Sequence, residues 1–218
     1  MRRVRYSVAM SLDGHIAGVN EEYDWIIMDP AIDFAAFFKG FDTVLMGRRT
    51  FEVAIRQGTG GKMPGMQSFV FSKTLRPADY PGITIVAAGT EETVARLKAA
   101  AGKDIWLMGG GVLFRSLLDA NLVDTVEVGV IPILLGQGIP VVHPGPGSAS
   151  LRLTDSRTLP SGIVMLSYTV QYGDAQHAAQ ADGPTRPGLG KRRKARTGPA
   201  RRLASTRLSR TAMREEKS

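Results

Sequence analysis

The sequence predicts an α/β fold with a mostly parallel central sheet and antiparallel strands at its C-terminal edge. Short apolar runs alternate with helical patterns through residues 4–118, and such alternation is typical of parallel sheets. Two of these runs pass directly through glycine into a helix, near residues 47 and 109. The last two strand patterns alternate apolar and polar residues around residues 160–162 (Pro-Ser-Gly), which indicates an antiparallel hairpin.

The spacing of apolar residues and the positions of turn residues predict the following elements, in chain order. Val4, Tyr6, Val8 and Met10 fall on one face of a first strand, and residues 11–22 form a loop rich in turn residues. The other predicted elements are a helix through residues 34–38 that ends at Gly40, a strand at 43–46, a helix at 50–56, a glycine-rich loop at 58–65, strands at 68–71 and 83–87, a helix capped by Thr90 that runs to residue 100, a strand at 105–108, a helix through 112–118, and strands at 123–130, 151–158 and 163–172.

The stretch 104–118 is the most informative part of the chain. An apolar run leads into Gly109, Gly110 and Gly111, and a helical pattern follows. Glycines at such a junction allow the backbone to approach a ligand, and the first helical N–H groups are unpaired, so a phosphate is favoured there. The alternative is a turn that needs glycine for packing alone. The spacing is not that of the common dinucleotide fingerprint, since Phe114 stands where a third small residue would be required.

A second strand–glycine–helix junction carries cations. Arg48, Arg49 and Thr50 follow Gly47 and offer guanidinium and hydroxyl donors to a phosphate. The alternative is a solvated helix start, although cations are unfavourable at a helix N-terminus. The next strand also ends with a hydroxyl and a cation, Ser72 and Lys73. Three phosphate-binding strand ends suit a dinucleotide that carries an extra 2′-phosphate, which is NADP rather than NAD.

The charge is concentrated after residue 173. Residues 175–218 hold twelve Lys or Arg and three acids, whereas the whole chain of 218 residues has a net charge of +8. We therefore predict two parts, a folded body at 1–173 and a basic disordered tail at 174–218. The tail offers cations for non-specific contact with nucleic acid or anionic surfaces, but it has no interleaved aromatic residues for stacking on bases.

Composition excludes several classes of protein. There is no cysteine, so disulfide, thiol and zinc-thiolate chemistry are excluded. No apolar run reaches membrane-spanning length, and the N-terminus lacks the apolar core of a signal peptide, so we expect a soluble, cytoplasmic protein. The histidines have no partners at metal-ligand spacing, and no metal is predicted. His15 in the first loop is read as a solvated residue or as a proton donor.

Four segments in order and at the right spacing resemble the dihydrofolate reductase superfamily. They are residues 11–17 (Ser-Leu-Asp-Gly-His-Ile-Ala), 42–52 (Asp-Thr-Val-Leu-Met-Gly-Arg-Arg-Thr-Phe-Glu), 106–114 (Trp-Leu-Met-Gly-Gly-Gly-Val-Leu-Phe) and 130–138 (Val-Ile-Pro-Ile-Leu-Leu-Gly-Gln-Gly). The match covers roughly residues 3–172 and is closest to the reductase domain of the bifunctional riboflavin-biosynthesis deaminase/reductase. The resemblance implies a three-layer dihydrofolate-reductase-like fold and an oxidoreductase that binds NADPH across the strand ends.

The resemblance also implies roles for individual residues. The nicotinamide would be bordered by Ala9, Ile16, Ala17 and the aromatic Phe114, with residues 11–22 as a mobile flap. The adenosine phosphates would lie on Gly47, Arg48, Arg49 and Thr50, the 2′-phosphate near Ser72 and Lys73, and the pyrophosphate on the turn formed by Met108, Gly109, Gly110, Gly111, Val112 and Leu113. Asp13 is read either as a catalytic residue at the substrate or as an Asp-Gly turn residue.

The chain departs from its relatives in two respects. The acid that binds the pterin in dihydrofolate reductase has no unique counterpart, since Asp29 and Asp33 both lie in the right region. The deaminase domain of the bifunctional enzyme is absent from these 218 residues. We expect an NADPH-dependent reductase of the riboflavin-biosynthesis type, acting on a small heterocyclic or sugar-imine substrate as a homodimer. The alternatives are reduction of another small molecule, including dihydrofolate, or a non-catalytic nucleotide-binding protein whose tail binds nucleic acid.

Overall fold

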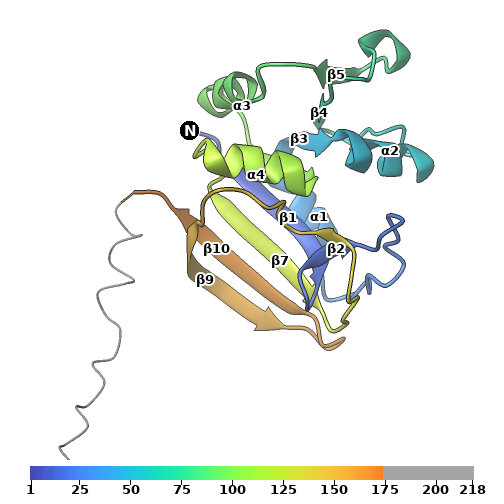
Figure 1. Cartoon of the computed structure of the whole chain (residues 1–218), viewed down its shortest axis with the longest axis vertical. Helices are drawn as coiled ribbons and strands as arrows, with labels where there is room; N and C mark the ends of the chain where they lie inside the picture. The colour runs from blue at the N-terminus through green and yellow to red at the C-terminus, as the bar shows by residue number, and fades with distance from the viewer. Residues whose placement is uncertain (174–218) are drawn as a thin grey trace, which may run out of the picture. The chain divides into compact units, whose positions relative to one another are not determined.

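The computed structural model describes residues 1–173. An eight-stranded sheet runs through it in the order β5-β4-β3-β6-β1-β7-β10-β9 (Figure 1). The strands are β1 (Val4–Ser11), β3 (Phe41–Gly47), β4 (Gln67–Phe71), β5 (Ile83–Val86), β6 (Asp104–Gly109), β7 (Thr125–Ile131), β9 (Ser150–Thr158) and β10 (Val164–Gln171). The helices are α1 (Phe34–Lys39), α2 (Arg48–Arg56), α3 (Thr90–Ala99) and α4 (Gly111–Asp119), with a short 3-10 turn η1 (Pro77–Asp79).

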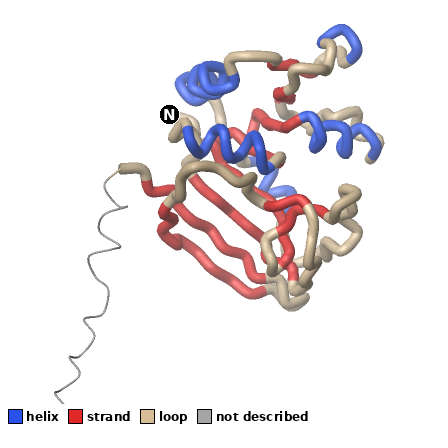
Figure 2. Tube along the Cα trace, in the orientation of Figure 1, coloured by secondary structure: helices blue, strands red, loops and turns tan. Residues whose placement is uncertain are grey.

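The predicted fold class is confirmed. The strands from β5 to β7 pair in parallel, and β10 pairs antiparallel with both β7 and β9. The antiparallel strands therefore lie at the C-terminal edge of the sheet (Figure 2). Strands buried on both faces read as continuous apolar runs, whereas β9 and β10 alternate because one side of this edge is open.

Helices cover both faces of the sheet, so the fold has three layers. Leu45 of β3 packs with α3 and α4 in one core cluster, where Leu113 and Leu117 of α4 are buried. Its neighbour Val44 points the opposite way and packs with Phe51 of α2 in a second cluster. Residues alternate between the two faces of a strand, and both faces of β3 are apolar because each is covered.

Two local expectations are corrected. Thr90 is the first residue of α3 rather than its cap, because Gly89 precedes it in the left-handed conformation at φ +67°. The predicted loop after β1 contains a short strand, β2 (His15–Ala17), which pairs with β8 (Ile139–Pro140) in a separate two-stranded sheet. Three residues of strand carry too little periodicity to be recognised from sequence.

The predicted basic tail, residues 174–218, lies outside the described residues. Within residues 1–173, every core cluster is built from residues between Val4 and Val170. Truncation after Gly173 is therefore expected to shift the thermal midpoint by less than about 2 °C, because all of these core clusters are retained. Binding to heparin, which depends on the number of cations, is expected to disappear. A truncated protein with a much lower midpoint would place the domain boundary further along the chain.

Candidate functional site

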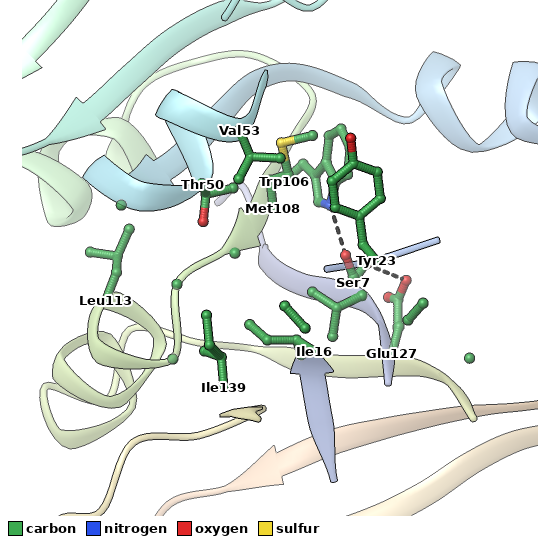
Figure 3. Close-up of a pocket in the computed structure, with 18 of the residues that line it drawn as sticks. Ser7, Ile16, Tyr23, Thr50, Val53, Trp106, Met108, Leu113, Glu127 and Ile139 are labelled. Atoms are coloured by element: carbon green, nitrogen blue, oxygen red, sulfur yellow. Dashed lines mark hydrogen bonds between the residues drawn. The ribbon is translucent and has the colours of Figure 1, made fainter. Parts of the chain in front are cut away.

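A cleft of about 1510 Å³ opens at the carboxyl ends of the parallel strands. This edge is where ligands bind in open α/β sheets. Figure 3 shows that the cleft has two halves, with Thr50 and Leu113 on one side and Ser7, Tyr23 and Glu127 on the other. We call these the junction half and the floor half. The first contains the two strand–glycine–helix junctions, and the second lies over the open face of the sheet near its antiparallel edge.

The two glycine junctions lie side by side in the junction half. Strands β3 and β6 are hydrogen-bonded neighbours, with Met46 opposite Gly109, so α2 and α4 both begin at the same edge. The residues at their N-caps, Gly47 and Gly110, provide no side-chain hydrogen bond to either helix. Unpaired N–H groups and the positive ends of two helix dipoles therefore meet in one cleft, which is an arrangement suited to a pyrophosphate.

Glycine is required at the second junction by conformation as well as by space. Gly110 has φ +102°, a region that residues with a side chain rarely adopt. A Cβ at Gly111 would lie 2.8 Å from the carbonyl oxygen of Pro140, which is closer than van der Waals contact allows. Gly47 differs from Gly110 in its ordinary φ of −74°, and it differs from Gly111 because a Cβ there would have no contact closer than 3.8 Å. The structure thus requires glycine at Gly110 and Gly111 whether or not a ligand binds. The cleft at this junction is nevertheless open to a ligand.

The cations predicted for the phosphates line the cleft. Arg49 and Lys73 are exposed there and form no ion pair with any residue in 1–173. Arg48 already has a partner within the chain, since its guanidinium lies 2.8 Å from the carboxylate of Glu52 one turn along α2. The Ser72 hydroxyl accepts hydrogen bonds from the backbone N–H groups of Thr74 and Leu75 and so holds the turn that presents Lys73.

Most of the remaining predicted cofactor contacts also line this cleft. This group comprises Ala9, Ile16, Ala17, Gly47, Thr50, Met108, Gly109, Gly110, Gly111, Val112 and Leu113. Ile16 and Ala17 belong to β2, and their partner strand β8 adds Ile139 to the wall. The small sheet β2–β8 therefore borders the cleft where the resemblance places the flap.

Phe114 does not lie where the resemblance placed it. Its ring is 5% exposed and stacks on Tyr6 with the ring centroids 3.8 Å apart. At the fourth position of α4 the side chain points back over the sheet into the core cluster. The position therefore supports packing between α4 and β1 and provides no aromatic surface in the cleft.

Asp13 also lies outside the cleft lining, and its contacts support the turn reading. Its carboxylate accepts hydrogen bonds from the backbone N–H groups of Leu135 and Gly136 at 3.1 and 2.7 Å, and from the Ser11 hydroxyl. The hydroxyl and backbone donors hold the pKa of Asp13 well below its ordinary value. The side chain thus clamps the loop after β1 to the loop after β7, and His15 lies 3.4 Å away.

We expect Asp13→Ala to loosen this clamp without removing a reacting group. Two backbone N–H groups lose a charged acceptor, so hydrogen exchange at Leu135 and Gly136 should become about tenfold faster or more. The KM for a cofactor should rise by a few-fold, and kcat should change less. Loss of kcat by more than about a hundredfold at unchanged KM would instead show that the carboxylate takes part in the reaction.

The acids considered as pterin ligands have structural partners. Asp33 caps α1 by accepting a hydrogen bond from the Ala36 N–H, and Asp29 is buried, where it accepts from the N–H groups of Ala31 and Ser161. Neither lines the cleft. One carboxylate that lines the floor half, Glu127, was not anticipated, although a polar residue in the middle of a buried strand pattern is a recognisable signal.

Sheet order, layers and cleft together define a dihydrofolate-reductase-like α/β domain. The RibD C-terminal domain family matches residues 2–165, and the chain belongs to that family. Two proteins of Bacillus subtilis strain 168, both named as uncharacterised, are similar over most of their length. YyaP is 34% identical, with the match covering 77% of this chain and 94% of YyaP, and YwjB is 28% identical, with 72% and 91% covered.

Solved structures agree with this assignment. A candidate riboflavin biosynthesis protein from Shewanella sp. PV-4 has a TM-score of 0.68 and 26% identity, with 79% of this chain and 100% of that chain covered. A dihydrofolate reductase from Enterococcus faecalis, solved with NADP(H), has a TM-score of 0.54 and 17% identity, with 78% and 97% covered, and shares the fold. Within residues 1–173 no helix has the length and apolar character needed to cross a membrane.

Proposed function

We propose that this protein is an NADPH-dependent reductase of the riboflavin-biosynthesis type. The observation that carries the proposal is the meeting of two uncapped helix N-termini with the exposed cations Arg49 and Lys73 in one cleft. The helix starts suit the pyrophosphate, and the two cations suit a 2′-phosphate. The membership of the RibD C-terminal domain family supports the reaction class.

The residues of the junction half fit a nicotinamide dinucleotide. The glycine backbones leave room for the phosphates, and Thr50 on α2 adds a hydroxyl beside the Gly109 turn. Ala9 and Gly129, opposite each other on β1 and β7, present little side-chain volume where the two halves meet. A ring can lie flat there. The cofactor, when bound, supplies a hydride, and the protein positions the acceptor carbon and excludes water.

The test is transfer of deuterium from NADPH labelled at the nicotinamide C4. The first acceptor is 5-amino-6-(5-phosphoribosylamino)uracil, and dihydrofolate is the comparison acceptor. We expect mass spectrometry to find one deuterium on the sugar C1 of the ribitylamino product, and faster turnover with this acceptor than with dihydrofolate. Binding of NADPH without transfer to the pyrimidine would overturn the riboflavin-type assignment. A protein that binds neither NADPH nor NADH would overturn the reductase assignment.

Three further expectations stay predictions. These are the homodimer, the cytoplasmic location and the contact of the basic tail with nucleic acid. The tail residues lie outside the described part of the chain.

A further inference from the structure

The floor half of the cleft is built from two parallel rows of side chains that cross four strands. Cα pairing aligns Ser7, Glu127, Ser167 and Asp155 in a polar row, and Ala9, Gly129, Met165 and Arg157 in a second row. All eight residues line the cleft. Because neighbouring strands are about 4.8 Å apart, the polar row extends away from the junction half over about 14 Å. None of its members belongs to the predicted cofactor site.

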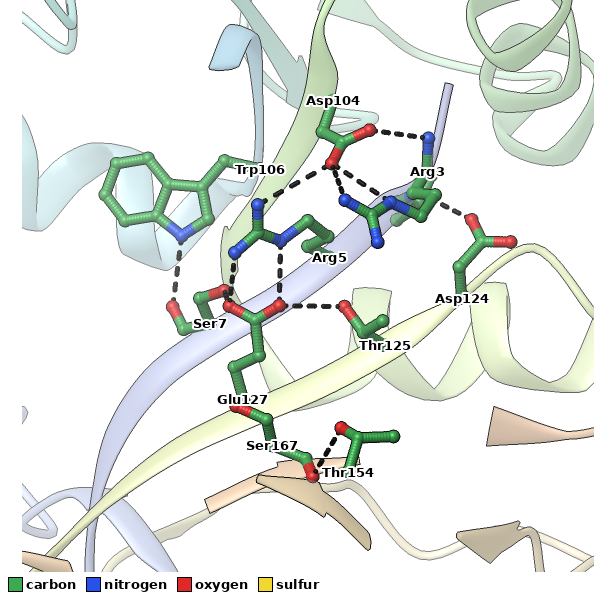
Figure 4. A network of polar contacts seen from close by, with 11 residues as sticks. Arg3, Arg5, Ser7, Asp104, Trp106, Asp124, Thr125, Glu127, Thr154 and Ser167 are labelled. Carbon is green, nitrogen blue, oxygen red and sulfur yellow. Dashed lines mark hydrogen bonds and ion pairs between the residues drawn. The ribbon is translucent and has the colours of Figure 1, made fainter. Parts of the chain in front are cut away.

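Glu127 is an ionised group with all of its acceptor positions in use. Its carboxylate accepts two hydrogen bonds from Arg5, at 2.7 and 2.8 Å, and one each from the hydroxyls of Ser7 and Thr125, at 2.9 and 3.0 Å (Figure 4). Burial raises the pKa of Glu127, but the hydrogen bonds and charge of Arg5 and the two hydroxyls outweigh burial, so that the pKa lies below its ordinary value. The carboxylate therefore has little capacity left for a ligand.

The hydrogen bond to Glu127 fixes the orientation of the Ser7 hydroxyl. A carboxylate only accepts, so the hydrogen of the Ser7 hydroxyl must point toward Glu127. The backbone carbonyl of Ser7 is also engaged, since it accepts a hydrogen bond of 3.0 Å from the Trp106 indole N–H. What Ser7 presents to the cleft is thus the lone pairs of its hydroxyl oxygen, in a residue that is 9% exposed. The hydroxyl can accept a hydrogen bond there, and it cannot donate one.

The cleft lining also includes an apolar wall. It consists of Tyr23, Ile27 and Met28 from the segment before α1, together with Phe34 and Phe38 of α1. Each of these side chains is at least 38% exposed, although aromatic and aliphatic side chains of this size are usually more buried. A flat ring between this wall and the floor would cover apolar surface on one side and meet the hydroxyl of Ser7 at its edge.

We propose that Ser7 is an acceptor-only recognition group for the molecule that is reduced. That molecule is a planar heterocycle, and it carries an N–H or O–H donor on the edge that faces β1. The proposal deepens the proposed function and rests on it for the reaction, but the predicted binding of a donor-bearing ring can be measured without turnover.

Ser7 and Thr125 form a matched pair for the test. Each donates one hydrogen bond to Glu127, but only Ser7 lines the cleft. The probe is 5,6-diaminouracil, titrated calorimetrically into protein saturated with NADP⁺. We expect Ser7→Ala to weaken binding by about tenfold or more, because a ligand N–H loses its acceptor on burial. Thr125→Ala should leave the affinity within about twofold. Ser7→Cys fills similar space but accepts hydrogen bonds weakly, so it should weaken binding as much as Ser7→Ala. It serves as the test variant if the alanine variant does not fold.

The outcomes separate this inference from the proposed function. Selective loss at Ser7 supports the inference even if no deuterium is transferred to the phosphoribosylamino acceptor, in which case the riboflavin-type assignment fails alone. An equal loss in the Ser7 and Thr125 variants would show that both act only through the Glu127 network, and it would overturn the inference. Unchanged affinity in the Ser7 variants, or no binding of the probe to the parent protein, would also overturn it.

Discussion

Gly47→Val is expected to lower affinity for NADPH by about a hundredfold while the protein stays folded. The affected position is the N-cap of α2, and it lines the cleft at the first glycine junction. A valine there places methyl groups where the pyrophosphate would approach the helix N–H groups. Loss of two hydrogen bonds to a charged group costs about 3–6 kcal/mol, and about 1.4 kcal/mol corresponds to a factor of ten, so a hundredfold is a conservative figure. Fluorescence titration of NADPH measures the change.

Gly47 offers a cleaner test than the glycines of the other junction. A Cβ at Gly47 would lie 3.8 Å from the Gly109 carbonyl oxygen and from the Gly110 Cα, which is ordinary contact, and its φ of −74° suits any residue. At Gly110, by contrast, φ is +102° and any side chain adds backbone strain. Gly47→Val with an unchanged thermal midpoint and unchanged NADPH affinity would show that the junction does not hold the cofactor.

Replacing Arg49 and Lys73 together by alanine is expected to reduce the preference for NADPH over NADH by about thirtyfold. Both cations are exposed in the cleft and free of ion pairs within residues 1–173, so a 2′-phosphate would be their partner. We expect about 1 kcal/mol from each of them, since solvent screens exposed charges. Affinity for NADH, which lacks that phosphate, should change by less than about threefold.

Arg76→Ala is the matched control for the double variant. Arg76, like Lys73, follows strand β4. It is highly exposed, lies outside the cleft lining and pairs with Asp79. Its loss removes one positive charge without touching the site, so the preference for NADPH should persist. A parent protein that binds NADH and NADPH equally well would contradict the assignment of these cations before any variant is made.

The junction half could be predicted because its signals are local in sequence. A strand, a glycine and a helix start are consecutive at Gly47 and again at Gly109–Gly111, and parallel strands bring such starts to one edge. Arg49 is the second residue of α2 at the first of these junctions, and Lys73 is the second residue after the end of β4. The fold class was predictable for a similar reason, since strands buried on both faces and strands open on one face leave different patterns.

The floor half could not be predicted because it depends on register. Ser7 meets Glu127 only through the pairing of β1 with β7, and 120 residues separate them in the chain. Two further side chains, Phe114 and Asp13, lie outside the cleft lining for related reasons. A resemblance assigns a role to a position in sequence, whereas the direction of the Phe114 side chain is decided by how α4 packs on Tyr6. The loop that Asp13 holds lies more than a hundred residues away.

The most direct test of the account is a crystal structure of the protein grown with NADP⁺. We predict the pyrophosphate at the starts of α2 and α4, the 2′-phosphate within hydrogen-bonding distance of Arg49 or Lys73, and the nicotinamide at Ala9 and Gly129 on the border of the floor half. Electron density for the cofactor anywhere outside this cleft, or a cleft that stays empty at a saturating concentration of NADP⁺, would contradict the account.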